Sequence, residues 1–137
     1  MRILLGSHGH FASGIKTALQ ILIGKDAEKV VVIDAYVDDV NIDEELRRFF
    51  DETAEDETVL MLSDLYGGSV NQKMYLYLQR PHTYLVAGIN LALVIELCLK
   101  DSISAEQLKE MVEIARQMQM VVELDTSDVE DTEEDFL

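Results

Sequence analysis

The chain alternates short unbroken apolar runs with longer stretches in which apolar residues recur at the spacing of a helix. The runs at 3–5, 29–33, 59–62 and 84–87 are typical of strands buried on both faces of a parallel sheet. Helices are expected between and after them, at 11–23, 42–53, 69–79, 90–99 and 105–117. This alternation predicts an α/β fold with a doubly wound, mostly parallel sheet of four strands.

A fifth apolar run, at 120–124, follows the last helix. It is typical of a C-terminal strand, which could return either parallel or antiparallel to the others. Seven acidic residues then lie between Asp125 and Asp135. Because runs of like charge are usually solvated and disordered, we expect one domain at 1–124 and a disordered acidic tail at 125–137.

Length and charge narrow the class of protein. A chain of 137 residues that is 48% hydrophobic suits one globular domain with a sizeable core. Its net charge of −16 argues against nucleic acid as a partner, since clustered Lys and Arg hold phosphate backbones. No apolar run reaches the roughly 18 residues of a membrane span, and residues 1–5 are strand rather than a basic, cleavable leader. These features predict a cytoplasmic protein.

A strand, a tight loop and a helix follow one another twice, at 2–13 and again at 59–72. Parallel strands end at the same edge of a sheet, and open α/β folds bind and react at that carboxyl edge. The first loop follows Gly6 and carries His8, whereas the second carries Asp64. The pattern therefore predicts an imidazole and a carboxylate at one edge.

His8 is the candidate nucleophile. Imidazole attacks phosphorus at neutral pH and gives a phosphoramidate that can pass its phosphoryl group on, and Gly9 leaves room for a partner's active site. Asp64 can accept a proton-bearing ring nitrogen of His8, which fixes the tautomer and frees the other nitrogen to attack. A turn-forming role is the alternative for Asp64, and the two roles are compatible.

The segment Gly67, Gly68 and Ser69 is the candidate phosphoryl-binding site. Its backbone N–H groups and the Ser69 hydroxyl are expected at a helix N-terminus, where phosphoryl oxygens are readily bound. Asn90, just past the fourth strand, either contacts the same site at a partner-facing surface or caps the helix that it precedes.

His10 forms a His-x-His pair with His8, and with Asp64 this pair resembles part of a metal site. A metal needs further ligands at the same edge, and His82 is expected at the opposite, amino edge. We therefore expect no metal and no other cofactor, and we expect His10 on the partner-facing surface. Cys98 falls on an apolar helical stripe, which predicts a buried, inert thiol.

Three motifs stand at strand ends: GSHG at 6–9, SDLYGGS at 63–69 and AGIN at 87–90. In this order and at these intervals they resemble the enzyme IIA components of the mannose-type bacterial sugar phosphotransferase system. The resemblance covers about residues 1–124. It departs from the family at Val70, where proline often follows GGS, but proline in a first helical turn only pre-sets the backbone.

The resemblance implies a phosphotransferase component that acts as a phosphocarrier. His8 would accept a phosphoryl group from phospho-HPr and pass it to an enzyme IIB, which works with the membrane components IIC and IID. In the resembled family the terminal strand crosses to a second subunit. We therefore expect a homodimer in which the strand at 120–124 is exchanged.

Two other functions stay open. The phosphotransfer subunit of a dihydroxyacetone kinase has a similar fold and also uses a loop histidine, but that group tends to Ser-His-Ser where Ser7, His8 and Gly9 stand, and it lacks the GGS loop. A non-catalytic flavodoxin- or receiver-like binding module is the alternative from another class. A receiver would require an acidic pair after the first strand, and a flavin binder a Ser/Thr-rich phosphate loop. The sequence has neither.

Overall fold

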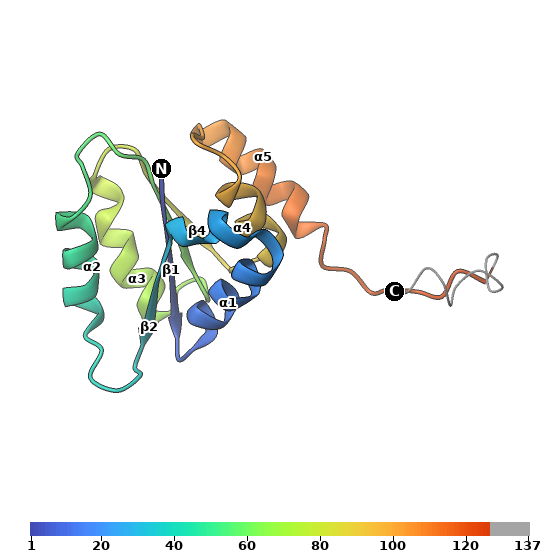
Figure 1. Ribbon diagram of the computed structural model, residues 1–137, viewed down its shortest axis with the longest axis horizontal. Helices are drawn as coiled ribbons and strands as arrows, with labels where there is room; N and C mark the ends of the chain where they lie inside the picture. Colours follow the sequence, from blue (N-terminus) through green and yellow to red (C-terminus); the bar gives the residue numbers. More distant parts are fainter. Residues whose placement is uncertain (127–137) are drawn as a thin grey trace.

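The computed structural model describes residues 1–126, and in them four strands alternate with α-helices along the chain (Figure 1). The strands are β1 (Arg2–His8), β2 (Val30–Ala35), β3 (Val59–Ser63) and β4 (Thr83–Ala87). The α-helices are α1 (Phe11–Ile23), α2 (Ile42–Asp51), α3 (Ser69–Tyr75), α4 (Leu91–Cys98) and α5 (Ala105–Arg116). Two 3₁₀-helices, η1 (Gly24–Lys29) and η2 (Leu76–Gln79), complete the order.

The four strands form one sheet in the order β2-β1-β3-β4, and every neighbouring pair is parallel. Helices α1, α4 and α5 cover one face, and α2 and α3 cover the other (Figure 1). The doubly wound α/β fold expected from the sequence is thus confirmed. The sheet is wholly parallel because each strand is followed by a helix that returns the chain to the same end.

The unbroken apolar runs are explained by burial on both faces of the sheet. In β1, Ile3 and Leu5 pack into the cluster beneath α1, α4 and α5, whereas Leu4 packs into the cluster beneath α2 and α3. Successive side chains of a strand point to opposite faces, and here both faces are core. β3 repeats the pattern, with all five of its residues buried.

Some element boundaries differ from the expectation. β1 does not stop at Gly6 but continues to His8, because Ser7 and His8 keep the parallel register with Asp34 and Ala35 of β2. The segment 25–28, between the helix expected at 11–23 and the strand expected at 29–33, lies within η1. The helix expected at 69–79 changes from α to 3₁₀ geometry after Tyr75.

The apolar residues of α1 are only partly buried. Phe11 and Leu22 are 50% and 58% exposed, whereas Ala12 and Leu19 are buried. Spacing alone defines a stripe but not which neighbours reach it, and the α1 stripe is covered only along part of its width.

The segment 120–124, expected as a C-terminal strand, pairs with none of the four strands in the single chain. It leaves the body after α5 (Figure 1). Its apolar side chains are exposed, Val121 to 87%. Most of the acidic tail expected at 125–137 lies outside the described residues. In the part of the chain that the structure describes, no helix combines the length and the apolarity needed to cross a membrane.

Gly6 lies where β1 passes beneath α3, and a methyl group added there would collide with the Met74 methyl and approach Val70. We expect Gly6→Ala to lower the free energy of unfolding by about 1–3 kcal/mol, because the core is overpacked. Gly14→Ala in α1 is the matched control: nothing lies within 4 Å of the added atom, and a helical alanine should stabilise by about 0.5–1 kcal/mol. Urea denaturation measures both, and equal midpoints for Gly6→Ala and the wild type would contradict the packing argument.

Candidate functional site

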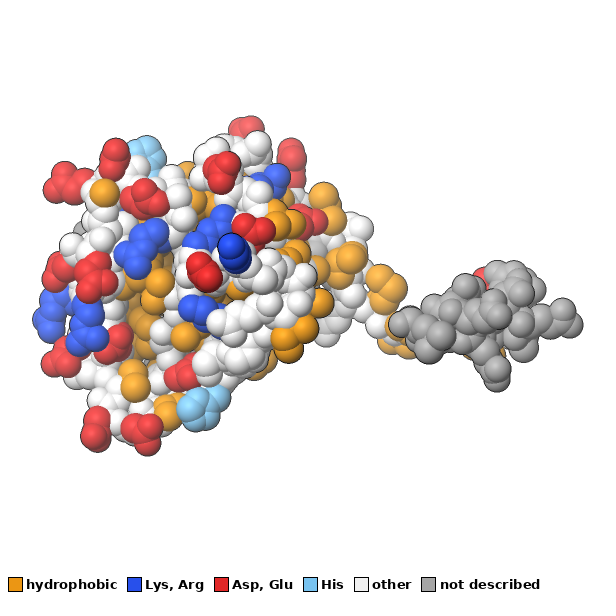
Figure 2. All heavy atoms as spheres, viewed as in Figure 1, with side chains coloured by type: hydrophobic (Ala, Val, Ile, Leu, Met, Phe, Trp, Pro, Cys, Tyr) orange, Lys and Arg blue, Asp and Glu red, His pale blue; other side chains and the backbone are white. Residues whose placement is uncertain are grey.

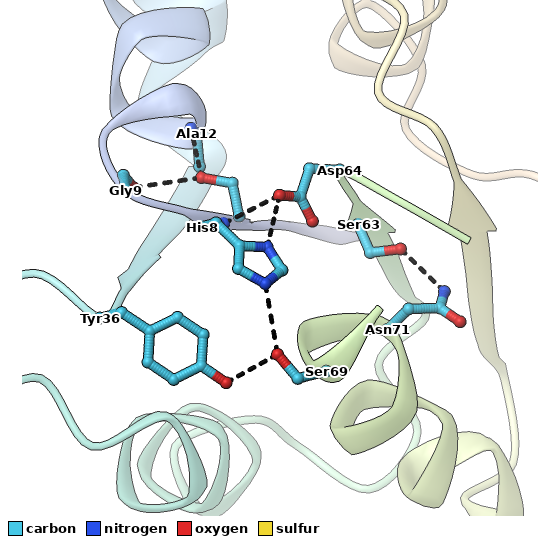
Figure 3. Close-up of polar contacts among 9 residues, drawn as sticks. His8, Gly9, Ala12, Tyr36, Ser63, Asp64, Ser69 and Asn71 are labelled. Carbon is cyan, nitrogen blue, oxygen red and sulfur yellow. Dashed lines mark hydrogen bonds and ion pairs between the residues drawn. The ribbon is translucent and has the colours of Figure 1, made fainter. Parts of the chain in front are cut away.

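The polar residues at the carboxyl edge come from three neighbouring strands. His8 is the last residue of β1, Asp64 follows the last residue of β3, and Tyr36 follows the last residue of β2. Parallel register brings these strand ends together, since Gly6 lies beside Ser63 and His8 beside Ala35. Ser69, the first residue of α3, completes the group (Figure 3).

His8 and Asp64 form a hydrogen-bonded dyad. The distance from His8 Nδ1 to Asp64 Oδ2 is 2.8 Å, and the His8 backbone N–H donates to the same oxygen at 2.9 Å. The two side chains are 46% and 16% exposed, so the carboxylate is largely covered while the imidazole is open to solvent. The prediction that Asp64 meets a ring nitrogen of His8 agrees with this geometry.

The ionisation of Asp64 fixes the tautomer of His8. Burial alone would raise the pKa of Asp64, but hydrogen bonds from the His8 backbone and ring outweigh it and hold the pKa below its ordinary value. An ionised carboxylate can only accept, so Nδ1 carries the ring proton and donates it. Nε2 therefore carries a lone pair and faces away from Asp64.

Two hydroxyl groups lie on the Nε2 side. Ser69 Oγ is 3.3 Å from His8 Nε2, and the Tyr36 hydroxyl is 2.7 Å from Ser69 Oγ (Figure 3). Because Nε2 is an acceptor, Ser69 donates to it and Tyr36 donates to Ser69. The Tyr36 ring also lies beside the imidazole, with centroids 5.4 Å apart.

The glycines of the second loop act differently from the expectation. The Gly67 N–H donates to Asn71 Oδ1 at 3.2 Å, and the Gly68 N–H donates to Leu65 O at 3.2 Å. The Gly67 donor is thus engaged by α3 and the Gly68 donor by the loop, and neither is left to bind a ligand at the site. Gly68 provides space, because a Cβ there would lie 3.3 Å from Leu65 O and 3.6 Å from His8 Cε1.

Ser7, for which the sequence predicted no role, shapes the turn that carries His8. Its buried hydroxyl accepts from the Ala12 N–H at 2.8 Å and donates to Gly9 O at 3.3 Å. Gly9 has a φ of 60° and donates its N–H to Ala35 O. The start of α1 is thereby tied to the ends of β1 and β2.

His10 belongs to a second pair and not to the dyad. Its Nδ1 lies 3.1 Å from Asp34 Oδ2, and its side chain is 75% exposed. Burial would raise the pKa of Asp34, but hydrogen bonds from Ser13 and then His10 lower it overall. Within residues 1–126, no group of three or more His, Cys, Asp or Glu side chains is arranged to hold a metal ion.

The remaining candidates have structural roles. Asn90 caps α4 by accepting from the Leu93 N–H, and its amide donates to Ala115 O in α5, so the capping alternative is the one observed. Cys98 is buried, and burial raises the pKa of its thiol. A thiol with a raised pKa holds less of the reactive thiolate, in agreement with the predicted inert cysteine.

Tyr36 is the site residue that sequence reasoning missed. No motif marks it, and its place over His8 depends on a left-handed backbone, with a φ of 64°. A non-glycine residue in that region is uncommon and often found at functional sites.

Residues 2–116 match the family described as PTS system fructose IIA component. The comparison with curated proteins finds no similar sequence. Several solved structures have the same fold.

The mannose/sorbose specific IIA subunit of the phosphotransferase system from Enterococcus faecalis superposes with a TM-score of 0.77 at 24% identity, over 90% of this chain and 96% of that one. Phosphotransferase system component EIIA from Streptococcus agalactiae gives a TM-score of 0.72 at 23% identity, over 88% and 95% of the two chains. The PTS IIA protein associated with the fucose utilization operon of Streptococcus pneumoniae gives 0.70 at 29% identity, over 88% and 91%.

Proposed function

From the premise that this chain belongs to the PTS system fructose IIA component family, with the mannose-type IIA fold, we propose that His8 accepts a phosphoryl group from phospho-HPr and passes it to an enzyme IIB. Family membership by itself gives the chain the general role of a sugar phosphotransferase system component. The observation that carries the finer proposal is the His8–Asp64 dyad, which directs the lone pair of Nε2 away from the carboxylate.

The proposed step moves one phosphoryl group between two imidazoles. The Nε2 lone pair of His8 attacks phosphorus, and the nitrogen–phosphorus bond of the donor breaks with its electron pair returning to the donor's nitrogen. The proton on Nδ1 stays where it is, so the phosphorylated ring becomes cationic. Asp64, 2.8 Å from Nδ1, neutralises that charge.

The phosphoryl oxygens need donors on the Nε2 side, and the Ser69 hydroxyl is the nearest, at 3.3 Å from the nitrogen. A bond of this length is weak and readily exchanged for one to a charged oxygen. We assign Gly67 and Gly68 to the same site for the room that they leave and the turn that they form, rather than for their N–H groups.

The donor and acceptor proteins reach His8 from the solvent side of the sheet edge. Three exposed apolar side chains lie close to the site residues along the chain and are candidates for the contact surface: Phe11 at the start of α1, and Leu65 and Tyr66 in the loop after β3. His10 stands at its rim. Since HPr, enzyme IIB and the inward faces of components IIC and IID meet in the cytoplasm, we place the protein there.

Incubation with phospho-HPr tests the proposal on the intact chain. We expect one phosphoryl group per chain, located on His8 by mass spectrometry at neutral pH and lost in acid, as phosphoramidates are. Addition of the cognate enzyme IIB should discharge it. Labelling of a different residue would contradict the assignment.

We infer further that the domain at 1–124 is completed by a second copy of the chain. Within the described residues β4 has a neighbour on one side only, and a groove of about 720 Å³ lies between β4 and α5, lined by Leu85, Leu108 and Val112 among others. The exposed apolar side chains at 118–124 lie where the chain leaves the body (Figure 2). The unpaired edge of β4 could pair with an extended apolar segment such as 120–124, which supports exchange of this segment in a homodimer.

Truncation tests this assembly. A chain ending at Gln117 should be unstable or aggregate, because the β4 edge and the groove lose their cover. A chain ending at Thr126 should remain a dimer, and phospho-HPr should still phosphorylate His8 in it. Size-exclusion chromatography with light scattering measures both. A folded full-length monomer of 15.5 kDa at micromolar concentration would disprove the exchange.

A further inference from the structure

We propose that the Tyr36 hydroxyl binds the phosphoryl group on His8 and shields it from water, which deepens the proposed function and rests on it. Tyr36 follows β2, on the side of His8 opposite Asp64 (Figure 3). Its hydroxyl reaches Ser69 Oγ at 2.7 Å, and its ring lies 5.4 Å from the imidazole. Among the tyrosines of residues 1–126, Tyr36 is the one that lies beside His8 and hydrogen-bonds Ser69.

The backbone at Tyr36 favours a role at the site. A φ of 64° places the residue in the left-handed region, which costs a residue with a Cβ about 1 kcal/mol or more. The large ring is nevertheless exposed, so burial of apolar surface does not offset that cost. The left-handed conformation directs the phenol over the carboxyl end of β1, towards His8 and Ser69.

The hydrogen bonds form a directed chain before transfer. Tyr36 donates to Ser69, Ser69 donates to His8 Nε2, and Nδ1 donates to Asp64. The lone pair on Nε2 is thus occupied by a hydroxyl, and phosphorus can approach only when Ser69 turns away. Once the nitrogen–phosphorus bond has formed, both hydroxyl protons are free to donate to phosphoryl oxygens.

Donation by two hydroxyls has two consequences. Negative charge on the phosphoryl oxygens during transfer is stabilised by donors already in place. The hydrogen bond from the Tyr36 hydroxyl to the phosphoryl group also holds the side chain over one approach to phosphorus, which slows hydrolysis of the phosphohistidine between donor and acceptor encounters. A carrier needs both properties, because the group must arrive quickly and remain until enzyme IIB binds.

Tyr36→Phe keeps the ring and removes only the hydroxyl. We expect the rate of phosphorylation by limiting phospho-HPr, measured by rapid quench, to fall about tenfold. The half-life of the isolated phosphoprotein should shorten several-fold. The final label should still reach one per chain on His8, and the thermal midpoint should not change. Tyr75→Phe, an exposed tyrosine in the last turn of α3, is the matched control and should behave as the wild type.

The Ser69→Ala background separates direct binding from an effect through Ser69. If the Tyr36 hydroxyl binds the phosphoryl group directly, Tyr36→Phe still slows transfer and shortens the half-life of the phosphoprotein when the Ser69 hydroxyl has been removed. If the hydroxyl only orients Ser69, it causes no further change there, and the proposal is wrong. Wild-type rates in Tyr36→Phe, or an equal slowing in Tyr75→Phe, overturn it as well. His8→Ala, run in parallel, tests the proposed function alone: a labelled His8→Ala rejects that function, whatever Tyr36→Phe does.

Discussion

His8→Ala is expected to reduce labelling by phospho-HPr to background, and to abolish transfer to enzyme IIB with it. Among residues 1–126, the side-chain groups that hydrogen-bond the His8 ring are the Asp64 carboxylate and the Ser69 hydroxyl, which carry oxygen and no imidazole nitrogen that could form a phosphoramidate. Removal of a covalent nucleophile eliminates the intermediate rather than slowing its formation. The measurement is incorporation of labelled phosphate per chain after exhaustive incubation with a phosphorylating system.

His10→Ala is the matched control. His10 is also a histidine at the carboxyl edge with a carboxylate at its Nδ1, but that carboxylate belongs to Asp34. The Ser69 hydroxyl and the Tyr36 ring instead contact His8. It should reach the same final labelling as the wild type. If His8→Ala were still labelled, or if His10→Ala lost its label, His8 would not be the acceptor.

Asp64→Asn should slow transfer by about 100-fold without preventing it. An amide carries no negative charge to balance the cationic phosphorylated ring, and its NH₂ group can donate to Nδ1, which moves the ring proton to Nε2 and blocks the attacking lone pair. Loss of the carboxylate in a hydrolase triad costs about 10⁴-fold. A smaller effect is expected here because the His8 side chain is 46% exposed and solvent screens part of the charge.

The Asp64 measurement separates rate from capacity. Quenched time courses should show a slow approach to nearly the same final label, with His8 still the labelled residue. Asp34→Asn alters the other carboxylate that pairs with a histidine at this edge, and its rate should stay within about twofold of the wild type. Equal slowing in the two variants would show that any nearby carboxylate suffices, and would remove Asp64 from its proposed role.

The chain's sequence was sufficient for the fold and for the dyad. Unbroken apolar runs between amphipathic stretches require strands that are buried on both faces, and the observed sheet has Ile3 and Leu4 in opposite cores. Once the strands are parallel, their carboxyl ends share an edge, so His8 and Asp64 had to lie near each other although 56 residues separate them.

Tertiary structure alone decided how the site is completed. Hydrogen-bond partners depend on backbone direction over a few ångströms. For that reason the Gly67 N–H donates to Asn71 in α3 and the Gly68 N–H to Leu65 O, while the Asn90 amide donates to α5. Tyr36 reaches His8 only because its backbone is left-handed and β2 lies beside β1. A sequence pattern records which residues are apolar and in what order, and these contacts instead follow from torsion angles and strand order that such a pattern does not contain.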